Sequence, residues 1–430
     1  MTESAEITQL VVPDFDTYLV EHSLRGAVPV EGGLELSWSD GMNNRVPNIW
    51  LREYSPDPGT FHSETREQRI ALTDIPQGLV ASDVAIGSDG FLQVTWSPEG
   101  LRSRYHPGWL RTAVSQSNNP LHVLPARKLW PCPVADPVFL NGAALYEGDN
   151  DALRNWLEIL HRDGVALLTG LPVDRTVIPA IVERIGPVRS SNFGSIFEVE
   201  SLPSANSNAY TAIALGVHSD LATREYVPGL QFLFCLENSV TGGESLLVDG
   251  FAVARQLREE SPEFFDVLST LPVPFGTKDR EYDHRFCAPI LEHNTAGELT
   301  TIRHTYWLRS PMQGDFDTLK HFYNAYRRFQ ELTNDPANQL RFRLEPGQLM
   351  AMDNRRILHG RAAFDPQSGT RLLRGCYGER EELESRLRIL YRQQRQQQQQ
   401  RQQQIQFYFV ERVSFLLISN TVQSGQSSFE

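Results

Sequence analysis

Two short His-x-Asp motifs occur in the chain, and one of them has a spacing suited to binding a metal ion. In His218-Ser219-Asp220 the two outer side chains point to the same face of an extended segment, because side chains alternate along a strand. An imidazole nitrogen and a carboxylate oxygen could then bind one ion. A second histidine would complete a set of two histidines and one carboxylate, which leaves three coordination positions open for substrates and O₂.

The other motif, His161-Arg162-Asp163, shows how readily this pattern arises by chance. It also resembles the catalytic loop of a protein kinase. A kinase needs an asparagine five residues after the aspartate, where this chain has Leu168, and no glycine-rich phosphate loop accompanies the motif. We therefore expect His161 and Asp163 to end a surface helix.

Later segments supply the partners that His218 and Asp220 need. Residues 353–361 contain His359, the candidate third ligand, and Arg371 follows twelve residues later, on what would be the next strand. The planar guanidinium of Arg371 could pair with a distant carboxylate through two hydrogen bonds. A 2-oxoglutarate molecule would fit this arrangement, chelating the metal through its keto-acid end, and Ser245 could add a hydrogen bond. Other histidines could in principle be the third ligand, namely His284, His293, His304 and His321. None of them is followed, within a strand pattern, by an arginine at a distance suited to binding the co-substrate.

Composition and charge exclude several classes of protein. The net charge of −13 argues against a dedicated nucleic-acid binder or a basic membrane-surface protein, so we expect a small-molecule substrate. The four cysteines form no CxxC pair, which fits a reducing compartment. The acidic start resembles neither a signal peptide nor a transit peptide, and no apolar run reaches the roughly 18 residues of a membrane span. We expect a cytoplasmic protein, with a mitochondrial location left open.

Hydrophobic patterns predict a mainly β protein with helices packed outside a barrel-like core. Alternation predicts strands over 34–38 and 90–96, each ending in a tryptophan that anchors the core. Further expected elements are helices over 151–163, 261–271 and 315–332, and strands over 348–352 and 371–377. We predict a small β-rich N-terminal domain (1–114), a proline-rich linker (115–137), a second domain (138–392) and a Gln-rich tail (393–430), disordered or accessory because it cannot form a core.

Several segments, taken in order, resemble one enzyme family. They are His218-Ser-Asp-Leu-Ala-Thr-Arg-Glu with Pro228-Gly-Leu-Gln-Phe, Thr241-Gly-Gly-Glu-Ser with Val248-Asp-Gly-Phe, and Asp353-Asn-Arg-Arg-Ile-Leu-His-Gly-Arg. The family is the TauD-type Fe(II)/2-oxoglutarate dioxygenases, and within it the γ-butyrobetaine and trimethyllysine hydroxylases of carnitine biosynthesis. The resemblance covers most of residues 32–391. It implies a double-stranded β-helix (jelly-roll) catalytic domain and a homodimer.

The resemblance also implies roles for individual residues. His218, Asp220 and His359 would bind Fe(II), while Arg371 and Ser245 would help hold 2-oxoglutarate, with O₂ as the other co-substrate and ascorbate as reductant. γ-Butyrobetaine hydroxylases surround the quaternary ammonium group with aromatic rings, a cation–π cage. Four aromatic residues stand at the matching positions here: Phe193, Phe197, Tyr210 and Tyr377.

Two departures from the family pattern bear on cofactor and substrate. Ser55, Asp57 and Thr60 stand where the family has cysteines that help bind a structural zinc, so we predict no zinc and expect His62 to be an ordinary loop residue. The asparagines that bind the substrate carboxylate in the family are not matched cleanly, since Ser207 stands at one of these places. The group that holds the substrate carboxylate is therefore expected to differ.

The resulting hypothesis is an enzyme that hydroxylates a small, cationic, amino-acid-like substrate such as γ-butyrobetaine. Decarboxylation of 2-oxoglutarate would yield succinate and CO₂. The first alternative is the same chemistry on trimethyllysine, a sulfonate or a specialised metabolite. The second is a non-enzymatic binding scaffold, which the intact set of His218, Asp220, His359 and Arg371 argues against.

Overall fold

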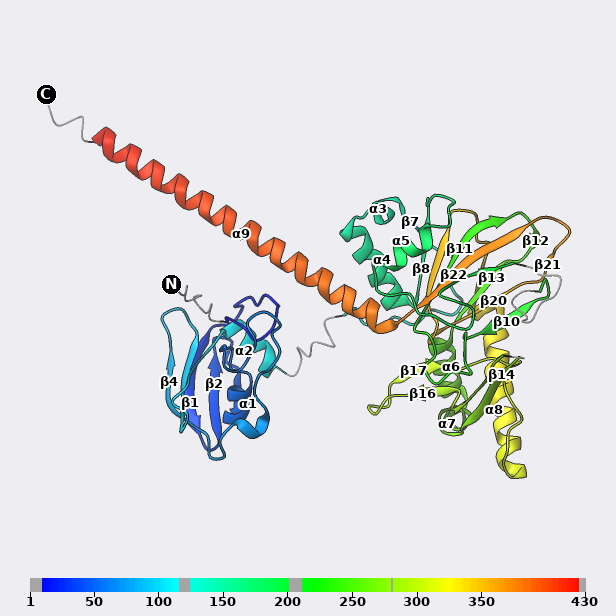
Figure 1. Cartoon of the computed structure of the whole chain (residues 1–430), viewed down its shortest axis with the longest axis horizontal. Coiled ribbons are helices and arrows are strands. Elements are labelled where there is room, and N and C mark those ends of the chain that lie inside the picture. Colours follow the sequence, from blue (N-terminus) through cyan, green and yellow to red (C-terminus); the bar gives the residue numbers. More distant parts are fainter. Residues whose placement is uncertain (1–9, 116–123, 201–210, 280, 425–430) are drawn as a thin grey trace. The chain divides into compact units, whose positions relative to one another are not determined.

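The computed structural model describes residues 10–115, 124–200, 211–279 and 281–424 of the chain, with side chains through 401 and at 404 (Figure 1). It divides into two compact units, Met1–Val123 with Tyr391–Glu430, and Leu124–Leu390. The fold is mainly β with helices, as the hydrophobic patterns predict. Among the described helices, none combines the length and the apolar character that a membrane crossing requires.

The first unit contains two antiparallel sheets with helices beside them. The sheets are β1 (Leu24–Val30), β2 (Gly33–Trp38) and β3 (Asn43–Pro47), and β4 (Val80–Ile86), β5 (Leu92–Ser97) and β6 (Arg102–Tyr105); the helices are α1 (Asn48–Glu53) and α2 (Pro107–Val114). The two strands expected from alternation are β2 and β5. Their terminal tryptophans, Trp38 and Trp96, are 3% and 0% exposed and belong to one hydrophobic cluster, so they anchor the core as predicted.

Hydrogen bonds connect the polar residues in the segment that departs from the zinc-binding pattern. Ser103 accepts a hydrogen bond from the Ser55 hydroxyl at 2.6 Å and another from the Trp96 ring nitrogen at 2.8 Å. Arg52 donates to Glu99 at 2.7 Å and to the Thr60 hydroxyl at 2.8 Å. We call the set Arg52, Ser55, Thr60, Trp96, Glu99 and Ser103 the N-terminal polar network. His62 lies in a loop, where its Nδ1 accepts from the backbone N–H groups of residues 64 and 65.

The second unit is built around two sheets. The six-stranded sheet has the order β7 (Phe139–Asn141), β8 (Val165–Thr169), β19 (Leu349–Asp353), β11 (Leu230–Asn238), β22 (Arg371–Gly378) and β9 (Ile196–Val199). The four-stranded sheet has the order β10 (Leu215–His218), β20 (Ile357–Arg361), β13 (Ser245–Asp249) and β18 (Gln339–Phe342). Shorter pairs are β12 (Thr241–Gly242) with β21 (Phe364–Asp365), β14 (Val273–Lys278) with β15 (Asp283–Ala288), and β16 (Leu291–His293) with β17 (Leu299–Ile302).

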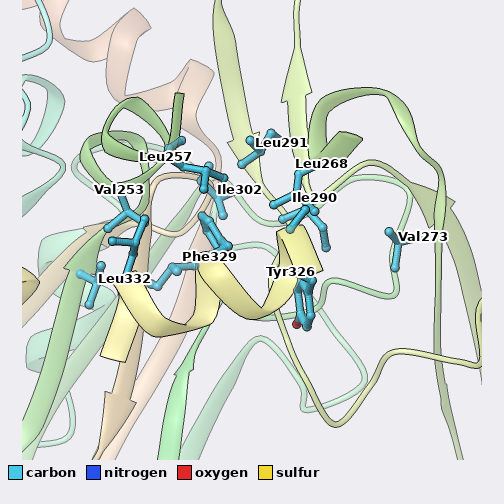
Figure 2. Close-up of a cluster of buried hydrophobic side chains, with 14 of the residues drawn as sticks. Val253, Leu257, Leu268, Val273, Ile290, Leu291, Ile302, Tyr326, Phe329 and Leu332 are labelled. Carbon is cyan, nitrogen blue, oxygen red and sulfur yellow. The ribbon is translucent and has the colours of Figure 1, made fainter. Parts of the chain in front are cut away.

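Helices pack beside these strands. They are α3 (Ala143–Tyr146), α4 (Asn150–Asp163), α5 (Val177–Val182), α6 (Gly250–Glu260), α7 (Pro262–Thr270) and α8 (Phe316–Asn334). Tyr326, Phe329 and Leu332 of α8 meet Val253 and Leu257 of α6 in a buried hydrophobic cluster (Figure 2). The same cluster includes residues of the four-stranded sheet, so the helices hold that sheet from one side.

The last helix, α9 (Arg380–Ser424), bears on the expectation about the tail. We expected residues 393–430 to be disordered or accessory, and the helix through the Gln-rich stretch to Ser424 contradicts the first of these alternatives while the second stays a prediction. In residues 393–404 the residue types explain the helix, because Gln and Arg favour the helical backbone even where no apolar face exists to build a core.

Candidate metal centre and its cavity

The four-stranded sheet places the two candidate histidines side by side. β10 and β20 pair in antiparallel register with His218 opposite His359, and their ring centroids lie 4.3 Å apart. Asp220 follows β10, and its Oδ1 lies 3.1 Å from Nε2 of His218 and 3.7 Å from Nε2 of His359. One potential ligand atom from each residue lies within 4.8 Å of the other two. The structure therefore brings together the three residues that the sequence selected.

Alternation along β10 and β20 explains why both histidines face the same side. Val217 and Leu358 each precede a histidine, are 3% and 0% exposed, and belong to the hydrophobic cluster of α6 and α8. Their neighbours must then point to the opposite face of the sheet. Packing of ordinary apolar residues against the helices thus orients the two rings toward Asp220.

Asn354 holds the backbone at Asp220. Its Oδ1 accepts the Asp220 N–H at 2.8 Å, and its Nδ2 donates to the carbonyls of Asp220 at 3.2 Å and Pro228 at 3.1 Å. Asn354 is fully buried, so these bonds do not compete with water. Leu221, the residue after Asp220, has a backbone φ of 55°, which residues other than glycine rarely adopt. The turn that presents Asp220 is strained, as often occurs at functional sites.

Arg303 supports the same turn from another direction. It is 1% exposed, donates to the carbonyls of Ala222 at 2.8 Å and Arg224 at 2.6 Å, and pairs with Glu292 at 2.7 Å. Sequence reasoning assigned no role to Arg303 or Asn354. Asn354 lies inside the motif of residues 353–361, which is the only sequence feature that points to it. Arg303 acts through contacts with backbone carbonyls, which no motif reveals.

The electrostatic surroundings keep Asp220 and His359 in the protonation states that bind a metal. Burial would raise the pKa of Asp220, but His359, His218 and the Tyr377 hydroxyl overcome this and hold the pKa below its usual range. Burial, together with His218, lowers the pKa of His359 to about 4, so its imidazole is neutral near pH 7. His218 Nδ1 lies 3.0 Å from the Gly216 carbonyl, which can only accept, so Nδ1 carries a proton and Nε2 is the nitrogen directed toward Asp220.

These residues fit a divalent iron. Two imidazole nitrogens and a carboxylate oxygen converge, and each is an atom that can coordinate a metal ion. The contact of His218 Nε2 with Asp220 Oδ1 at 3.1 Å holds two of these atoms beside each other. Two histidines and one carboxylate are the ligand set of non-haem iron(II) oxygenases.

A cavity of about 530 Å³ opens from this cluster, and the predicted co-substrate residues line it. Ser245 begins β13 and Arg371 begins β22, so the two sheets contribute one residue each. Burial, with a contribution from Arg361, lowers the pKa of Arg371 to about 10, which leaves it charged at neutral pH. Trp307 also lines the cavity, with its ring 4.7 Å from that of His218.

Three of the four predicted cage residues form a continuous row of rings along the same cavity. The Phe193 and Phe197 centroids lie 5.9 Å apart, and those of Phe197 and Tyr377 lie 5.1 Å apart. Phe197 lies opposite Gly375 across β9 and β22, where an added Cβ would lie 2.8 Å from the Phe197 ring. The glycine therefore makes room for the ring. Tyr210, the fourth predicted cage residue, lies outside the described residues.

The residues that sequence reasoning set aside do not line this cavity. His161 and Asp163 lie in the last turn of α4, which Gly164 ends with a φ of 79°. Arg374, a conceivable alternative to Arg371, pairs instead with Glu198 at 2.9 Å. The rival histidines are likewise absent from the lining: His284, His293, His304 and His321.

Comparisons with known proteins agree with the geometry. Residues 134–377 match the family model described as "Taurine catabolism dioxygenase TauD, TfdA family". The chain is 41% identical to the γ-butyrobetaine dioxygenase of Pseudomonas sp. (strain AK-1) over 384 residues, which is 89% of this chain and 100% of that protein. It is 28% identical to the trimethyllysine dioxygenase of Meyerozyma guilliermondii (83% of this chain, 93% of that protein) and 27% identical to human γ-butyrobetaine dioxygenase (83% and 94%).

Proposed function

The chain belongs to the TauD/TfdA dioxygenase family, and on that premise we propose that it hydroxylates a small trimethylammonium acid such as γ-butyrobetaine. It is an enzyme, a dioxygenase that depends on iron(II) and 2-oxoglutarate. The observation that carries the substrate proposal is the row of Phe193, Phe197 and Tyr377 rings in the same cavity as the His218, Asp220 and His359 cluster.

Each part of the cavity has a distinct task in this proposal. His218, Asp220 and His359 would hold the iron, which when bound supplies the activation of O₂ that couples decarboxylation of 2-oxoglutarate to hydroxylation of a C–H bond. Arg371 would pair with the distal carboxylate of 2-oxoglutarate, with Ser245 donating a further hydrogen bond. The aromatic rings would orient the substrate and exclude water around its cationic end.

The rings suit a quaternary ammonium group for electrostatic reasons. Their faces carry negative quadrupole density, and a trimethylammonium group has no N–H that would need a hydrogen-bond acceptor. Each desolvated contact contributes about 0.5–2 kcal/mol. The two phenylalanines have no hydroxyl and the Tyr377 hydroxyl is bound to Asp220, so the rings present mainly apolar faces to the substrate.

Lys278 is our candidate for binding the substrate carboxylate. Besides histidines, the cations among the described lining residues are Lys278, Arg361 and Arg371. Arg361 donates to the carbonyls of Thr211 and Ile213, and Arg371 is assigned to the co-substrate. Lys278 ends β14, and the residue opposite it, Asp283, pairs with Arg285 at 2.6 Å. Arg285, and to a smaller extent Lys278, lower the pKa of Asp283, and because Arg285 makes the close ion pair we assign the Lys278 ammonium to a ligand in the cavity.

Trimethyllysine is the second candidate substrate, because the similar proteins include trimethyllysine dioxygenases at 28% identity. It has the same cationic end and adds an α-amino group. The higher identity, 41%, to a γ-butyrobetaine dioxygenase favours the smaller acid.

Succinate formation from 2-oxoglutarate, with Fe(II) and ascorbate present, would test the proposal. We expect turnover with γ-butyrobetaine to exceed that with trimethyllysine, and to exceed that with the neutral analogue in which carbon replaces the ammonium nitrogen. If the neutral analogue is turned over as well as the cation, the rings form only an apolar pocket and the trimethylammonium proposal is wrong.

We infer further that residues 138–392 form a double-stranded β-helix catalytic domain and residues 1–114 a smaller N-terminal domain. The four-stranded sheet and the six-stranded sheet, which is antiparallel except for the pair β7 and β8, both line the cavity and support the first assignment. We also propose a cytoplasmic homodimer without a zinc site. Light scattering of the purified chain measures the oligomeric state, and elemental analysis tests for bound zinc.

A further inference from the structure

The two carboxylate oxygens of Asp220 have different surroundings. Oδ1 faces the histidines, 3.1 Å from Nε2 of His218 and 3.7 Å from Nε2 of His359. Oδ2 accepts two short hydrogen bonds, one from Nε2 of Gln231 at 2.6 Å and one from the Tyr377 hydroxyl at 2.7 Å. One oxygen is therefore directed toward the metal position, while the other is already engaged by protein donors.

The sheet register explains why two donors reach one oxygen. Gln231 of β11 lies directly opposite Tyr377 of β22, so the two side chains stand side by side on one face of the six-stranded sheet. They are 3% and 2% exposed. Asp220 comes from the end of β10, in the four-stranded sheet, so the bonds join the metal-binding cluster to the neighbouring sheet.

The orientation of the Gln231 amide is set by this contact. Its Nε2 can donate to the carboxylate, whereas the reversed amide would bring two acceptors within 2.6 Å. Its Oε1 has no hydrogen-bond partner among the described residues, so the bond to Asp220 is the polar contact that orients the amide.

We propose that Gln231 and Tyr377 are positioning residues that make Asp220 a one-oxygen ligand. With Oδ2 held by two donors, only Oδ1 is available to the metal, and the third open coordination position stays free for O₂ or the keto acid. The same bond ties the Tyr377 ring, a member of the aromatic row, to the metal ligand. The inference rests on the proposed metal set but does not depend on the identity of the substrate.

Co(II) binding to the purified full chain tests this proposal, because cobalt reports both affinity and coordination number through its visible absorption. The variants are Tyr377→Phe, which removes only the hydroxyl, Gln231→Met, which removes the donor at similar volume, and the double variant. We expect the double variant to bind Co(II) roughly 10- to 100-fold more weakly, with smaller losses for each single variant, as is typical when outer partners of a metal ligand are removed. We also expect the visible bands of the double variant to shift as Oδ2 becomes free to coordinate.

Tyr105→Phe is the matched control. Tyr105 is also fully buried, and its hydroxyl donates to the Leu51 carbonyl at the same 2.7 Å, but it lies in the first unit. We expect this variant to lose stability and to keep the Co(II) affinity and spectrum of the original chain. If Gln231→Met does not fold, Gln231→Asn withdraws the donor while remaining polar.

Two results would overturn the proposal, and they differ from a failure of the proposed function. Unchanged Co(II) affinity and spectrum in the double variant would show that the pair does not position Asp220. An equal loss of affinity in Tyr105→Phe would show a general effect of stability. Failure of the original chain to bind Co(II) would instead refute the metal assignment itself, while a wrong substrate would leave all these measurements unaffected.

Discussion

The N-terminal polar network and the His218, Asp220 and His359 cluster are both buried polar groups, but their hydrogen-bonding chemistry differs. In the network each contact joins a donor to an acceptor, as when Ser103 accepts from Ser55 and Trp96. In the cluster three potential metal ligands converge, with a carboxylate oxygen 3.1 Å from an imidazole nitrogen. A buried set whose donors and acceptors are matched stabilises a fold, whereas a buried set of converging imidazoles and a carboxylate is suited to a metal ion.

Removing one of the three candidate metal ligands should have the largest effect on turnover. His218→Ala, Asp220→Ala or His359→Ala should each abolish turnover while the far-UV circular dichroism stays unchanged, because each variant loses one of three protein ligands. The other His-x-Asp motif supplies the control, and His161→Ala should retain activity. Full activity in any ligand variant would refute the metal assignment.

Arg371→Ala should have the next largest effect. Loss of a charge-assisted pair of about 1.5–3 kcal/mol should raise KM for 2-oxoglutarate roughly 10- to 100-fold. Arg374 is the matched control on the same strand, because it pairs with Glu198 and does not line the cavity. If KM for 2-oxoglutarate rises in Arg374→Ala and not in Arg371→Ala, then Arg374 rather than Arg371 binds the co-substrate.

Ser103→Ala should distinguish the network from the cluster. It leaves the Ser55 hydroxyl and the Trp96 N–H without their buried acceptor, which should cost about 1–3 kcal/mol of unfolding free energy. Co(II) affinity should stay the same, since the network has no metal role in our interpretation. The two quantities are measured by urea denaturation and by Co(II) titration, and a coupled loss of both would contradict the distinction.

Lys278→Met should have a smaller effect. Lys278 is exposed, so its pair with a substrate carboxylate is worth about 0.2–1 kcal/mol, or roughly a 1.4- to 5-fold rise in KM for γ-butyrobetaine. KM for 2-oxoglutarate should not change. Lys320→Met, on α8 and outside the cavity lining, is the control. An unchanged KM for γ-butyrobetaine would assign its carboxylate to another group.

Deletion of residues 393–430 should have the smallest effect on catalysis, within a few-fold of the full chain. None of the residues assigned to the metal, the co-substrate or the substrate lies beyond Tyr377. Steady-state kinetics and light scattering of the truncated chain provide the measurement. Loss of solubility or of the dimer would show that α9 has a structural role.

The sequence predicted the strands and ligands that depend on local pattern. Alternation located β2 and β5, and the spacing of His218, Asp220 and His359 located the cluster. The aromatic positions Phe193, Phe197 and Tyr377 came from family resemblance, because an isolated aromatic residue more often belongs to a core.

Other parts of the site depend on relations that a single sequence does not contain. The pairing of Gln231 with Tyr377 at one oxygen of Asp220 depends on which residue of β22 lies opposite Gln231, and such register emerges only from the folded sheet. The roles of Asn354 and Arg303 depend on the turn at Leu221, whose unusual backbone angle no pattern announces. The helical form of residues 393–404 was not predicted, because a Gln-rich stretch without apolar residues shows no hydrophobic period.

The pairing of His218 with His359 has a thermodynamic consequence. These residues are far apart in the chain but opposite each other on β10 and β20, so an ion bound to both cross-links two distant segments. In an unfolded chain the same ligands would have to be brought together against the entropy of closing a long loop. Metal loading should therefore raise the melting temperature in a concentration-dependent way. At a free metal concentration of a hundred times Kd, the gain in unfolding free energy should be about 2.7 kcal/mol.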